Sequence, residues 1–369
     1  MRYVSINSVP NGSTGAVMQQ VTEERRALGD ECWCMWGRGR AAGNDYEFNF
    51  GTKPELYLDV LQTRIDGKAG FHSKRATRRL LNKLDEIQPD VVHLHNIHGY
   101  YVNIVMLFDW LAVHDNVQVM WTLHDCWAFT GHCAYFTYVG CRQWNDCCAY
   151  RDSCPQIHTY PKTFSKKSPE WNYVHKQSVF TRIPSDRLTL ITPSHWLEGL
   201  VSESFLAKYP VVVRHNTVEK TIFKPTPSDF RERYGVGDRI MVLGVASPWT
   251  ERKGLGDFVQ LSKTLESDRF LVVLVGLSKK QIRSLPRTII ALERTESIQE
   301  LAAIYTAADI FFNPTREDNY PTVNLEAEAC GTPVITYDTG GCRETVALPE
   351  SRVIKNYIDS IELIKAQRL

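Results

Sequence analysis

Short apolar runs alternate with amphipathic segments along the whole chain. The first half contains predicted strands at residues 2–8, 31–36, 90–94 and 117–123, with a helix at 15–28 between the first two. The run at 117–123 is largely apolar, which is typical of a strand buried on both faces of a parallel sheet. The alternation restarts with predicted strands at 188–192, 211–214, 240–245, 270–275, 310–313 and 333–336. This order predicts an α/β fold class with parallel sheets.

The length of the chain predicts two domains, because 369 residues exceed what one hydrophobic core usually organises. Pro225 and Pro227 mark a linker before a short polar helix. We therefore expect an N-terminal domain at 1–216, which carries a cysteine-rich insertion at 126–160, and a C-terminal domain at 217–369. After Glu344 the remaining residues are expected to supply one terminal helix, at 357–367.

Composition and charge narrow the classes of function. Hydrophobic residues make up 43% and charged residues 23% of the chain, and the net charge is +1. That balance creates no global field for nucleic acid, so no nucleic-acid partner is predicted. The first ten residues do not resemble a secretory signal, and the apolar stretch at 100–113 is too short to span a bilayer. We expect a cytoplasmic protein.

A basic pair follows the first predicted strand of the second domain. Arg252 and Lys253 lie in the segment Ser-Pro-Trp-Thr-Glu-Arg-Lys-Gly at 247–254. Ligands of open α/β sheets bind at the carboxyl edge, where this loop would lie. A diphosphate leaving group needs fixed positive charge, which adjacent Arg and Lys supply. The alternative is a solvated basic turn.

A second segment, at 317–327, leads from the predicted strand 310–313 into a helix. Its backbone N–H groups would form an anion site at the helix N-terminus, and Glu326 could accept hydrogen bonds from ribose hydroxyls. The alternative is an acidic cluster that only caps the helix. The residues expected to line the donor phosphates are Asn319, Tyr320, Pro321, Thr322 and Val323.

Together these segments, with Ala-Ala-Asp-Ile-Phe-Phe-Asn-Pro-Thr at 307–315 and Glu-Ala-Glu-Ala-Cys-Gly-Thr-Pro-Val at 326–334, resemble the C-terminal domain of family 4 (group 1) glycosyltransferases of the bacterial polysaccharide-biosynthesis type. The resemblance implies a GT-B fold, with two Rossmann-like domains facing each other across a cleft. It also implies that Arg252 and Lys253 hold the diphosphate of a UDP- or GDP-sugar and that Glu326 contacts the ribose. The family spacing of its two acids pairs Asp318 with Glu326, but Glu317 also fits, so both are candidates for the acid near the transferred sugar.

In the first half, the loop at 11–15 and the histidines at two predicted strand ends are the candidate chemistry. The resemblance places Gly15 across the cleft from the donor and makes His124 the candidate that contacts the transferred sugar. His93, His95 and His98 also fit a metal-like spacing or packed strand positions. In this family type the acceptor attacks from the leaving-group face and the departing phosphate takes the proton, so a retaining transfer needs no enzyme nucleophile. The chain has no Asp-x-Asp motif, and we expect no cofactor requirement for catalysis.

Six of the ten cysteines fall within 126–154. Four thiolates from one loop can close a structural zinc site, and a similar insertion occurs in some polysaccharide glycosyltransferases. Reduced, partly buried thiols are the alternative, followed by disulfides. The predicted zinc ligands are Cys133, Cys141, Cys148 and Cys154.

The acceptor is expected to be a polysaccharide or a lipid-linked saccharide. A basic helix-like stretch supports peripheral contact with the inner face of the plasma membrane, although a solvated helix face is the alternative. A nucleotide-sugar epimerase and a non-catalytic nucleotide-sugar-binding scaffold are the alternative functions. The basic side chains of the stretch are Lys68, Lys74, Arg75, Arg78, Arg79 and Lys83.

Overall fold

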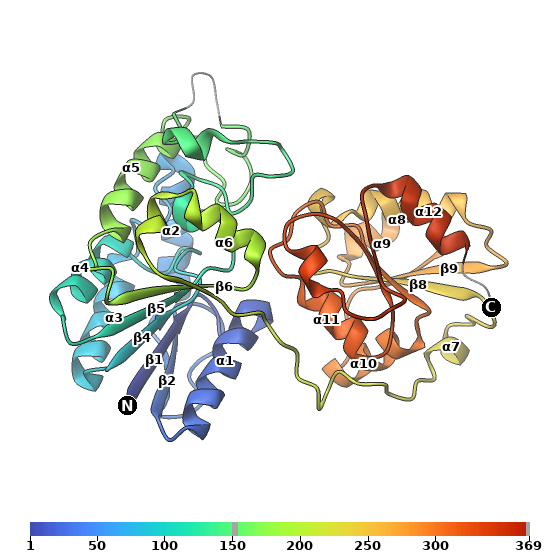
Figure 1. The fold of residues 1–369 in the computed structure, drawn as a ribbon, viewed down its shortest axis with the longest axis horizontal. Coiled ribbons are helices and arrows are strands. Elements are labelled where there is room, and N and C mark those ends of the chain that lie inside the picture. The colour runs from blue at the N-terminus through green and yellow to red at the C-terminus, as the bar shows by residue number, and fades with distance from the viewer. Residues whose placement is uncertain (150–153, 367–369) are drawn as a thin grey trace. The chain divides into compact units, whose positions relative to one another are not determined.

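The computed structural model describes residues 1–149 and 154–366, which form two compact units, Met1–His215 and Asn216–Leu369. Each unit is a parallel sheet covered by helices (Figure 1). The predicted α/β class with parallel sheets is thereby confirmed. No helix in the described ranges combines the length and the apolar character needed to cross a membrane.

In the described residues, unit 1 contains a seven-stranded parallel sheet in the order β3-β2-β1-β4-β5-β6-β7. The order reverses between β1 and β4, so the loops after these two strands emerge side by side. The strands are β1 (Arg2–Asn7), β2 (Glu31–Trp36), β3 (Glu47–Asn49), β4 (Val91–Leu94), β5 (Gln118–Thr122), β6 (Leu188–Thr192) and β7 (Val211–Val213). The helices are α1 (Gly12–Ala27), α2 (Lys53–Asp66), α3 (Lys74–Ile87), α4 (Ile104–Val113), α5 (Ser168–Phe180) and α6 (His195–Ser202).

The described part of unit 2 contains a six-stranded parallel sheet in the order β10-β9-β8-β11-β12-β13, with the reversal between β8 and β11. The strands are β8 (Ile240–Val245), β9 (Phe270–Val275), β10 (Ile289–Leu292), β11 (Ile310–Asn313), β12 (Val334–Tyr337) and β13 (Arg352–Ile354). The helices are α7 (Phe230–Arg233), α8 (Leu255–Thr264), α9 (Lys279–Ser284), α10 (Ile298–Ala307), α11 (Thr322–Ala329) and α12 (Tyr357–Lys365).

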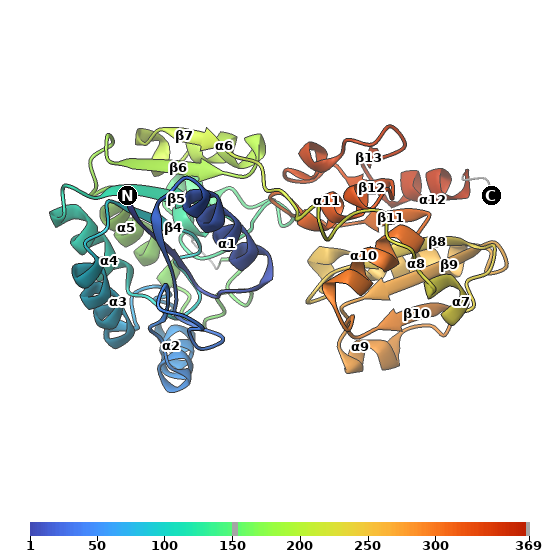
Figure 2. The ribbon, with the colours of Figure 1, turned by 90° about the horizontal axis from the view of Figure 1, so that it is seen from below.

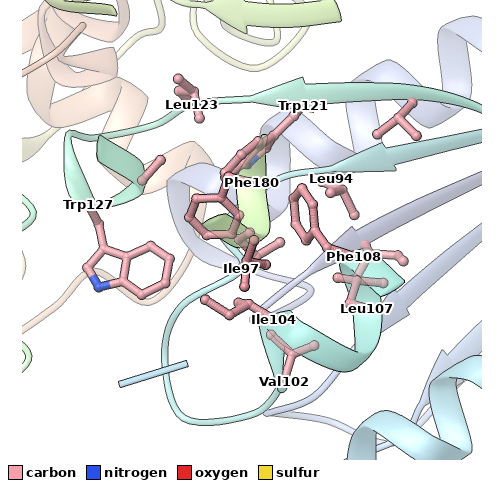
Figure 3. Packing of buried hydrophobic residues seen from close by; sticks show 14 of the residues in the cluster. Leu94, Ile97, Val102, Ile104, Leu107, Phe108, Trp121, Leu123, Trp127 and Phe180 are labelled. Carbon is pink, nitrogen blue, oxygen red and sulfur yellow. The ribbon is translucent and has the colours of Figure 1, made fainter. Parts of the chain in front are cut away.

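The core of unit 1 lies between the sheet and the helices α4 and α5 (Figure 3). The rings of Phe108 and Phe180 meet Trp121 with centroids 5.6 Å and 4.9 Å away. Val119 and Trp121 of β5 face this core, whereas Met120 packs on the opposite face beside Tyr3, so the strand carries apolar side chains on both faces. Trp127, just beyond β5, closes the same core. The loop that follows β5 is therefore anchored by buried aromatic packing.

The chain after Glu344 differs from the expectation of a single helix. It forms the edge strand β13 before α12, and Ile335 of β12 pairs in register with Arg352. Three residues are enough for an edge strand because the neighbouring strand supplies its hydrogen-bond partners. The predicted helix end at Gln367, like residues 150–153 of the predicted insertion, lies outside the described residues.

Gly254 lies between the loop after β8 and α8, close to the loop after β11. Its φ is +75°, and a Cβ added there would lie 2.4 Å from the carbonyl oxygen of Pro314. Gly254→Ala should therefore lower the free energy of unfolding by about 1–3 kcal/mol in urea denaturation. Gly256 is the matched control because a Cβ there meets nothing within 4 Å. Gly256→Ala, within α8, should raise stability by up to about 1 kcal/mol. Equal losses in both variants would contradict the close approach of the two loops.

Candidate functional site

In unit 2, hydrogen bonds hold the loop after β8 in place at the point where its two cations follow. The indole Nε1 of Trp249 donates to the carbonyl oxygen of Val275 at 2.8 Å, and Gln281 Nε2 donates to the carbonyl oxygen of Trp249 at 3.0 Å. The chain then makes a short 3₁₀ turn, Glu251–Lys253. Two strong anchors thus precede Arg252 and Lys253.

Both cations contact the loop after β11, the neighbouring strand across the order reversal. Arg252 Nη1 donates to the carbonyl oxygen of Glu317 at 2.5 Å, and Lys253 Nζ lies 2.5 Å from Asp318 Oδ2. The backbone N–H of Arg316 donates to the carbonyl oxygen of Arg252 at 2.7 Å. The two motifs that the sequence shows separately therefore form one cluster at the carboxyl edge of the sheet.

Asp318 is held as a carboxylate within this cluster. Burial opposes its ionisation, but the charges of Lys253 and Arg252 outweigh burial and lower the pKa of the carboxyl. Its side chain is 14% exposed and that of Lys253 is 22% exposed, so water screens the pair incompletely. The result is a fixed pair of cations whose charge is partly offset by one acid. An incoming anionic group would meet guanidinium and ammonium donors already in place.

Glu317 and Asp318 differ in their surroundings. Glu317 is 1% exposed, and its backbone carbonyl also accepts from the hydroxyl of Thr315 at 3.1 Å. Gly340 is required behind Asp318, because a Cβ at Gly340 would lie 1.8 Å from the carbonyl oxygen of Asp318. Both acids are thus locked by backbone contacts. Both acids therefore stay candidates for the contact with a sugar.

The segment predicted to line the phosphates leads directly into α11. Pro321 caps the helix, which begins at Thr322, and Val323 lies in its first turn. The backbone N–H of Asn319 donates to Asp318 Oδ1 at 2.9 Å, and the hydroxyl of Tyr320 donates to the carbonyl oxygen of Glu344 at 3.2 Å. The N-terminus of α11 therefore adjoins the cation cluster.

Glu326 lies on the second turn of α11. The hydroxyl of Tyr305, on α10, donates to Glu326 Oε2 at 2.9 Å and orients the carboxyl group. Burial raises the pKa of Glu326, and the hydrogen bonds from Tyr305 and Thr322 oppose that rise. A carboxyl group held in this way can accept hydrogen bonds from hydroxyl groups, as the sequence prediction requires.

Arg316, which neither sequence motif marks, supports this cluster. Its guanidinium donates to Asp257 Oδ1 at 2.6 Å and lies over the ring of Tyr337 at 5.1 Å. Tyr337 in turn donates to the other oxygen of Asp257 at 2.5 Å. This network ties β12 and α8 to the loop that carries Glu317. The position of Arg316 directly before the two acids is the only signal that the sequence offers.

In unit 1, Gly15 lies in the first turn of α1, after the loop from β1. A Cβ at Gly15 would lie 2.5 Å from the carbonyl carbon of Pro10, so the loop packs directly on the helix there. Asn7, at the end of β1, donates from Nδ2 to the carbonyl oxygen of Val9 at 3.0 Å and accepts from the N–H of Asn96 at 3.2 Å. Asn7 thereby joins the loops after β1 and β4.

A row of histidines crosses β4 and β5. His93 is buried between the hydroxyls of Tyr3, at 2.6 Å from Nδ1, and Thr122, at 2.7 Å from Nε2. His95 Nδ1 lies 3.2 Å from His124 Nε2. The predicted residue His124 is thus held at the carboxyl edge of the sheet by a second histidine.

Asp125 also lies at this edge of the sheet, directly after His124. Its Oδ2 lies 2.9 Å from His98 Nε2, and its Oδ1 accepts from the N–H of Trp127 at 2.9 Å. Burial opposes ionisation of Asp125, but His98 and the backbone hydrogen bond lower its pKa. His95, His98, His124 and Asp125 line a small pocket. This pocket can present imidazole nitrogens to a polar ligand.

The four predicted zinc ligands are all buried in unit 1. Cys133 lies near the other three: burial raises the pKa of its thiol, and Cys154, Cys148 and Cys141 raise it further. The backbone N–H of Gly131 donates to the sulfur of Cys148 at 3.2 Å. Taking the described residues of unit 1 alone, no three candidate ligand atoms lie within 4.8 Å of one another.

A buried lysine adjoins these thiols. Lys176 of α5 donates from Nζ to the carbonyl oxygens of Trp127 at 2.8 Å and Thr130 at 3.0 Å. Burial lowers its pKa to about 7, and the neighbouring Cys148 and Cys133 oppose that fall. Lys176 therefore connects α5 to the cysteine-bearing loop that follows His124.

The buried histidines predict how stability depends on pH. Burial lowers the pKa of His93 to about 3 and those of His124 and His132 to about 4. It also holds the pKa of His95 well below its usual range. In the unfolded chain, histidine binds a proton below about pH 6.5. Protons therefore favour the unfolded state, and the free energy of unfolding should fall as pH drops from about 6.5 towards 5, by at most about 1.4 kcal/mol per pH unit for each histidine.

Urea denaturation at several pH values across this window measures that slope. His124→Asn should remove roughly one quarter of it, because one of the four buried imidazoles is lost. A free energy of unfolding that stays flat across the window would show that these imidazoles are not kept neutral by burial.

The second unit matches a known family model, and the chain is similar to several known proteins. The family model described as Glycosyl transferases group 1 matches residues 238–366. A colanic acid biosynthesis glycosyl transferase of Escherichia coli (strain K12), WcaC, is 23% identical over 292 residues, which are 70% of this chain and 62% of the relative. Glycogen synthase of Streptococcus sanguinis (strain SK36) is 22% identical over 315 residues, 76% of this chain and 64% of the relative. The chain thus spans a little under two thirds of the length of these relatives.

Solved structures agree on the fold. Sucrose-phosphate synthase from Thermosynechococcus elongatus superposes with a TM-score of 0.68 at 15% identity, covering 99% of this chain and 88% of that one. HepE of Anabaena, solved in complex with UDP and glucose, gives 0.62 at 13% identity, with 99% and 89% covered. Residues 238–366 thus match the model of the group 1 glycosyl transferases, and the chain as a whole has the two-domain GT-B fold of these solved structures.

Proposed function

We propose that this chain is a retaining glycosyltransferase that moves a hexose from a UDP- or GDP-sugar to a polysaccharide or lipid-linked saccharide acceptor. The observation that carries the proposal is the cation cluster at the β8/β11 reversal, where Arg252 and Lys253 contact the loop of Glu317 and Asp318. Ligands of open α/β sheets bind at such a reversal.

The chemistry of the donor explains why two cations are needed there. Transfer breaks the bond between the anomeric carbon and the diphosphate oxygen and forms a bond to the acceptor oxygen. Negative charge grows on the departing diphosphate, and fixed Arg and Lys donors stabilise that charge more than they stabilise the intact donor. The acceptor hydroxyl attacks from the face that the diphosphate leaves, so retention needs no side chain as nucleophile. Its proton passes to the departing diphosphate, so no side chain has to act as base.

The remaining predicted residues take roles around this cluster. The N-terminus of α11, at Asn319 to Val323, would face the phosphates, and Glu326 would accept hydrogen bonds from the ribose. Either Glu317 or Asp318 would contact the transferred sugar. In unit 1, His124 would contact that sugar as a neutral imidazole, which burial favours, and the loop at Gly15 would line the site.

The relatives support this assignment. Their names describe glycosyl transfer in colanic acid biosynthesis and glycogen synthesis, and HepE was solved with UDP and glucose. An epimerase would rearrange the donor without an acceptor, and a scaffold would bind it without turnover. Incubating the protein with donor alone separates these cases, because a transferase without acceptor should release nucleotide only slowly.

Donor binding is tested first, by thermal shift against UDP, GDP, ADP and their common sugars. A ligand that binds only the native state raises the melting temperature, and ligand at about 100 times its Kd adds about 2.7 kcal/mol. Arg252→Ala and Glu326→Ala should each abolish the shift given by the preferred nucleotide. Lys263→Ala is the control, since Lys263 is an exposed cation on α8 outside the cluster.

That control should keep the full shift. A shift retained in Arg252→Ala would place the diphosphate elsewhere. Absence of a shift with every nucleotide would contradict the transferase proposal.

We also propose that Cys133, Cys141, Cys148 and Cys154 hold a structural zinc ion. Four thiolates around Zn²⁺ carry a net charge of about −2, which is costly to bury unless it is offset. Lys176 lies buried beside the cluster, where the charges of Cys148 and Cys133 favour its protonated form. The N–H of Gly131 already donates to the sulfur of Cys148. Zinc would draw the four sulfurs closer together than they lie here and order the loop after His124.

Metal analysis tests this site on protein purified without a metal-affinity column. About one zinc per chain is expected. Cys133→Ser should lose the zinc and lower the melting temperature by about 5–10 °C. Cys147→Ser is the matched control, because Cys147 is exposed in the same loop. This variant should keep both the zinc and the wild-type melting temperature. Zinc-free wild-type protein, or a disulfide between any two of the four cysteines in peptide mass spectrometry, would overturn the assignment.

A further inference from the structure

Helix α2 exposes a stripe of large apolar side chains. Tyr57, Leu58, Leu61 and Ile65 are 70%, 55%, 56% and 65% exposed. At about 100° per residue, their spacing places all four within roughly 100° of the helix circumference. Single exposed apolar residues are ordinary, but four on one face of one helix mark a contact surface.

The opposite face of α2 is fixed to unit 1. Asp59 and Thr63 are buried there and hydrogen-bonded to each other at 3.1 Å, and the hydroxyl of Ser73, just before α3, donates to Asp59. In Figure 2, α2 stands at the margin of unit 1, farther from the sheet than α3. The stripe therefore faces outward on a rigid support.

Phe164 extends the stripe at the C-terminal end of α2. Its ring is 67% exposed, and its backbone N–H donates to the carbonyl oxygen of Arg64 at 2.9 Å. Thr163 also donates to that carbonyl oxygen, at 3.2 Å. We call the set of Tyr57, Leu58, Leu61, Ile65 and Phe164 the α2 patch.

Basic side chains border the α2 patch. Two nearby acids are engaged, Glu55 by Arg79 and Asp66 by His72, the latter at 3.1 Å, while Glu170 is exposed. Basic groups thus outnumber acids at the border. The basic residues at the C-terminal end of α2, on the turn after it and on the segment of Phe164 are Arg64, Lys68, Lys162, Lys166 and Lys167.

We propose that the α2 patch docks on the surface of an anionic lipid bilayer, with its apolar side chains at the level of the acyl chains and its lysines at the lipid phosphates. An apolar stripe bordered by cations has the chemistry of an interfacial helix, and each basic group near an anionic surface adds to the attraction. The predicted basic stretch at 68–83 contributes less than the sequence suggested, because Arg79 and Lys83 are paired with Glu55 and Glu86. Docking would hold unit 1 where a lipid-linked acceptor is concentrated.

Flotation with vesicles tests the docking without any donor or acceptor, so its outcome is separate from that of the transferase proposal. The full-length protein should bind vesicles of equal parts phosphatidylglycerol and phosphatidylcholine, bind pure phosphatidylcholine at least about tenfold more weakly, and be released by high salt. Leu61→Gln combined with Ile65→Gln should reduce binding to the anionic vesicles about tenfold or more. Lys166→Glu combined with Lys167→Glu should reduce it similarly.

Val113→Gln and Ile358→Gln are matched controls, because Val113 and Ile358 are 75% and 66% exposed on other helices. Both should bind like the wild type, and the melting temperature of each variant checks folding. Absence of wild-type binding to anionic vesicles, or equal binding by Leu61→Gln/Ile65→Gln, would overturn the proposal. A wild-type dimer in light scattering that becomes a monomer in that double variant would instead show that a second copy covers the patch.

Discussion

The parallel pairing of β8 with β11 is the constraint on which the candidate donor site depends. Parallel strands end at the same edge, and because the strand order reverses between these two, no crossover helix fills the space at their ends. Two loops that are separated by about sixty residues along the chain therefore meet. The meeting is fixed by Lys253 against Asp318 and by Arg252 against the carbonyl oxygen of Glu317. In unit 1 the reversal between β1 and β4 joins the loops of Asn7 and Asn96 in the same way.

The carboxyl edges of the two sheets differ in their electrostatics. The edge of unit 2 keeps its charges, because each cation is hydrogen-bonded to an acid or a carbonyl group before any ligand arrives. The edge of unit 1 keeps its imidazoles neutral, because burial lowers the pKa of His93 and His124 far below neutrality. A charged leaving group suits the first edge and an uncharged sugar suits the second. This division follows from burial and pairing within each unit.

Most of the central strands could be predicted from the sequence, and the predicted strand at 240–245 coincides with β8. Strands β3, β10 and β13 were not predicted, because each lies at a sheet edge, where a short segment becomes a strand only through its neighbour. The candidate residues of unit 2 could be named from two motifs, but their contact could not, since it depends on strand order. Arg316 and Gly340 could not be predicted for the same reason. Their partners, Asp257 and the carbonyl oxygen of Asp318, lie in other segments of the sequence.

The adjacent acids Glu317 and Asp318 hold the two cations in different ways. Glu317 holds Arg252 through its backbone carbonyl, so that contact survives any change of the Glu317 side chain. Asp318 holds Lys253 through its carboxylate, so that contact depends on the side chain and on its low pKa. A bound diphosphate would compete with Asp318 for Lys253 but need not displace Glu317 from Arg252. The guanidinium can therefore stay in place through a reaction cycle, while the ammonium exchanges one anionic partner for another.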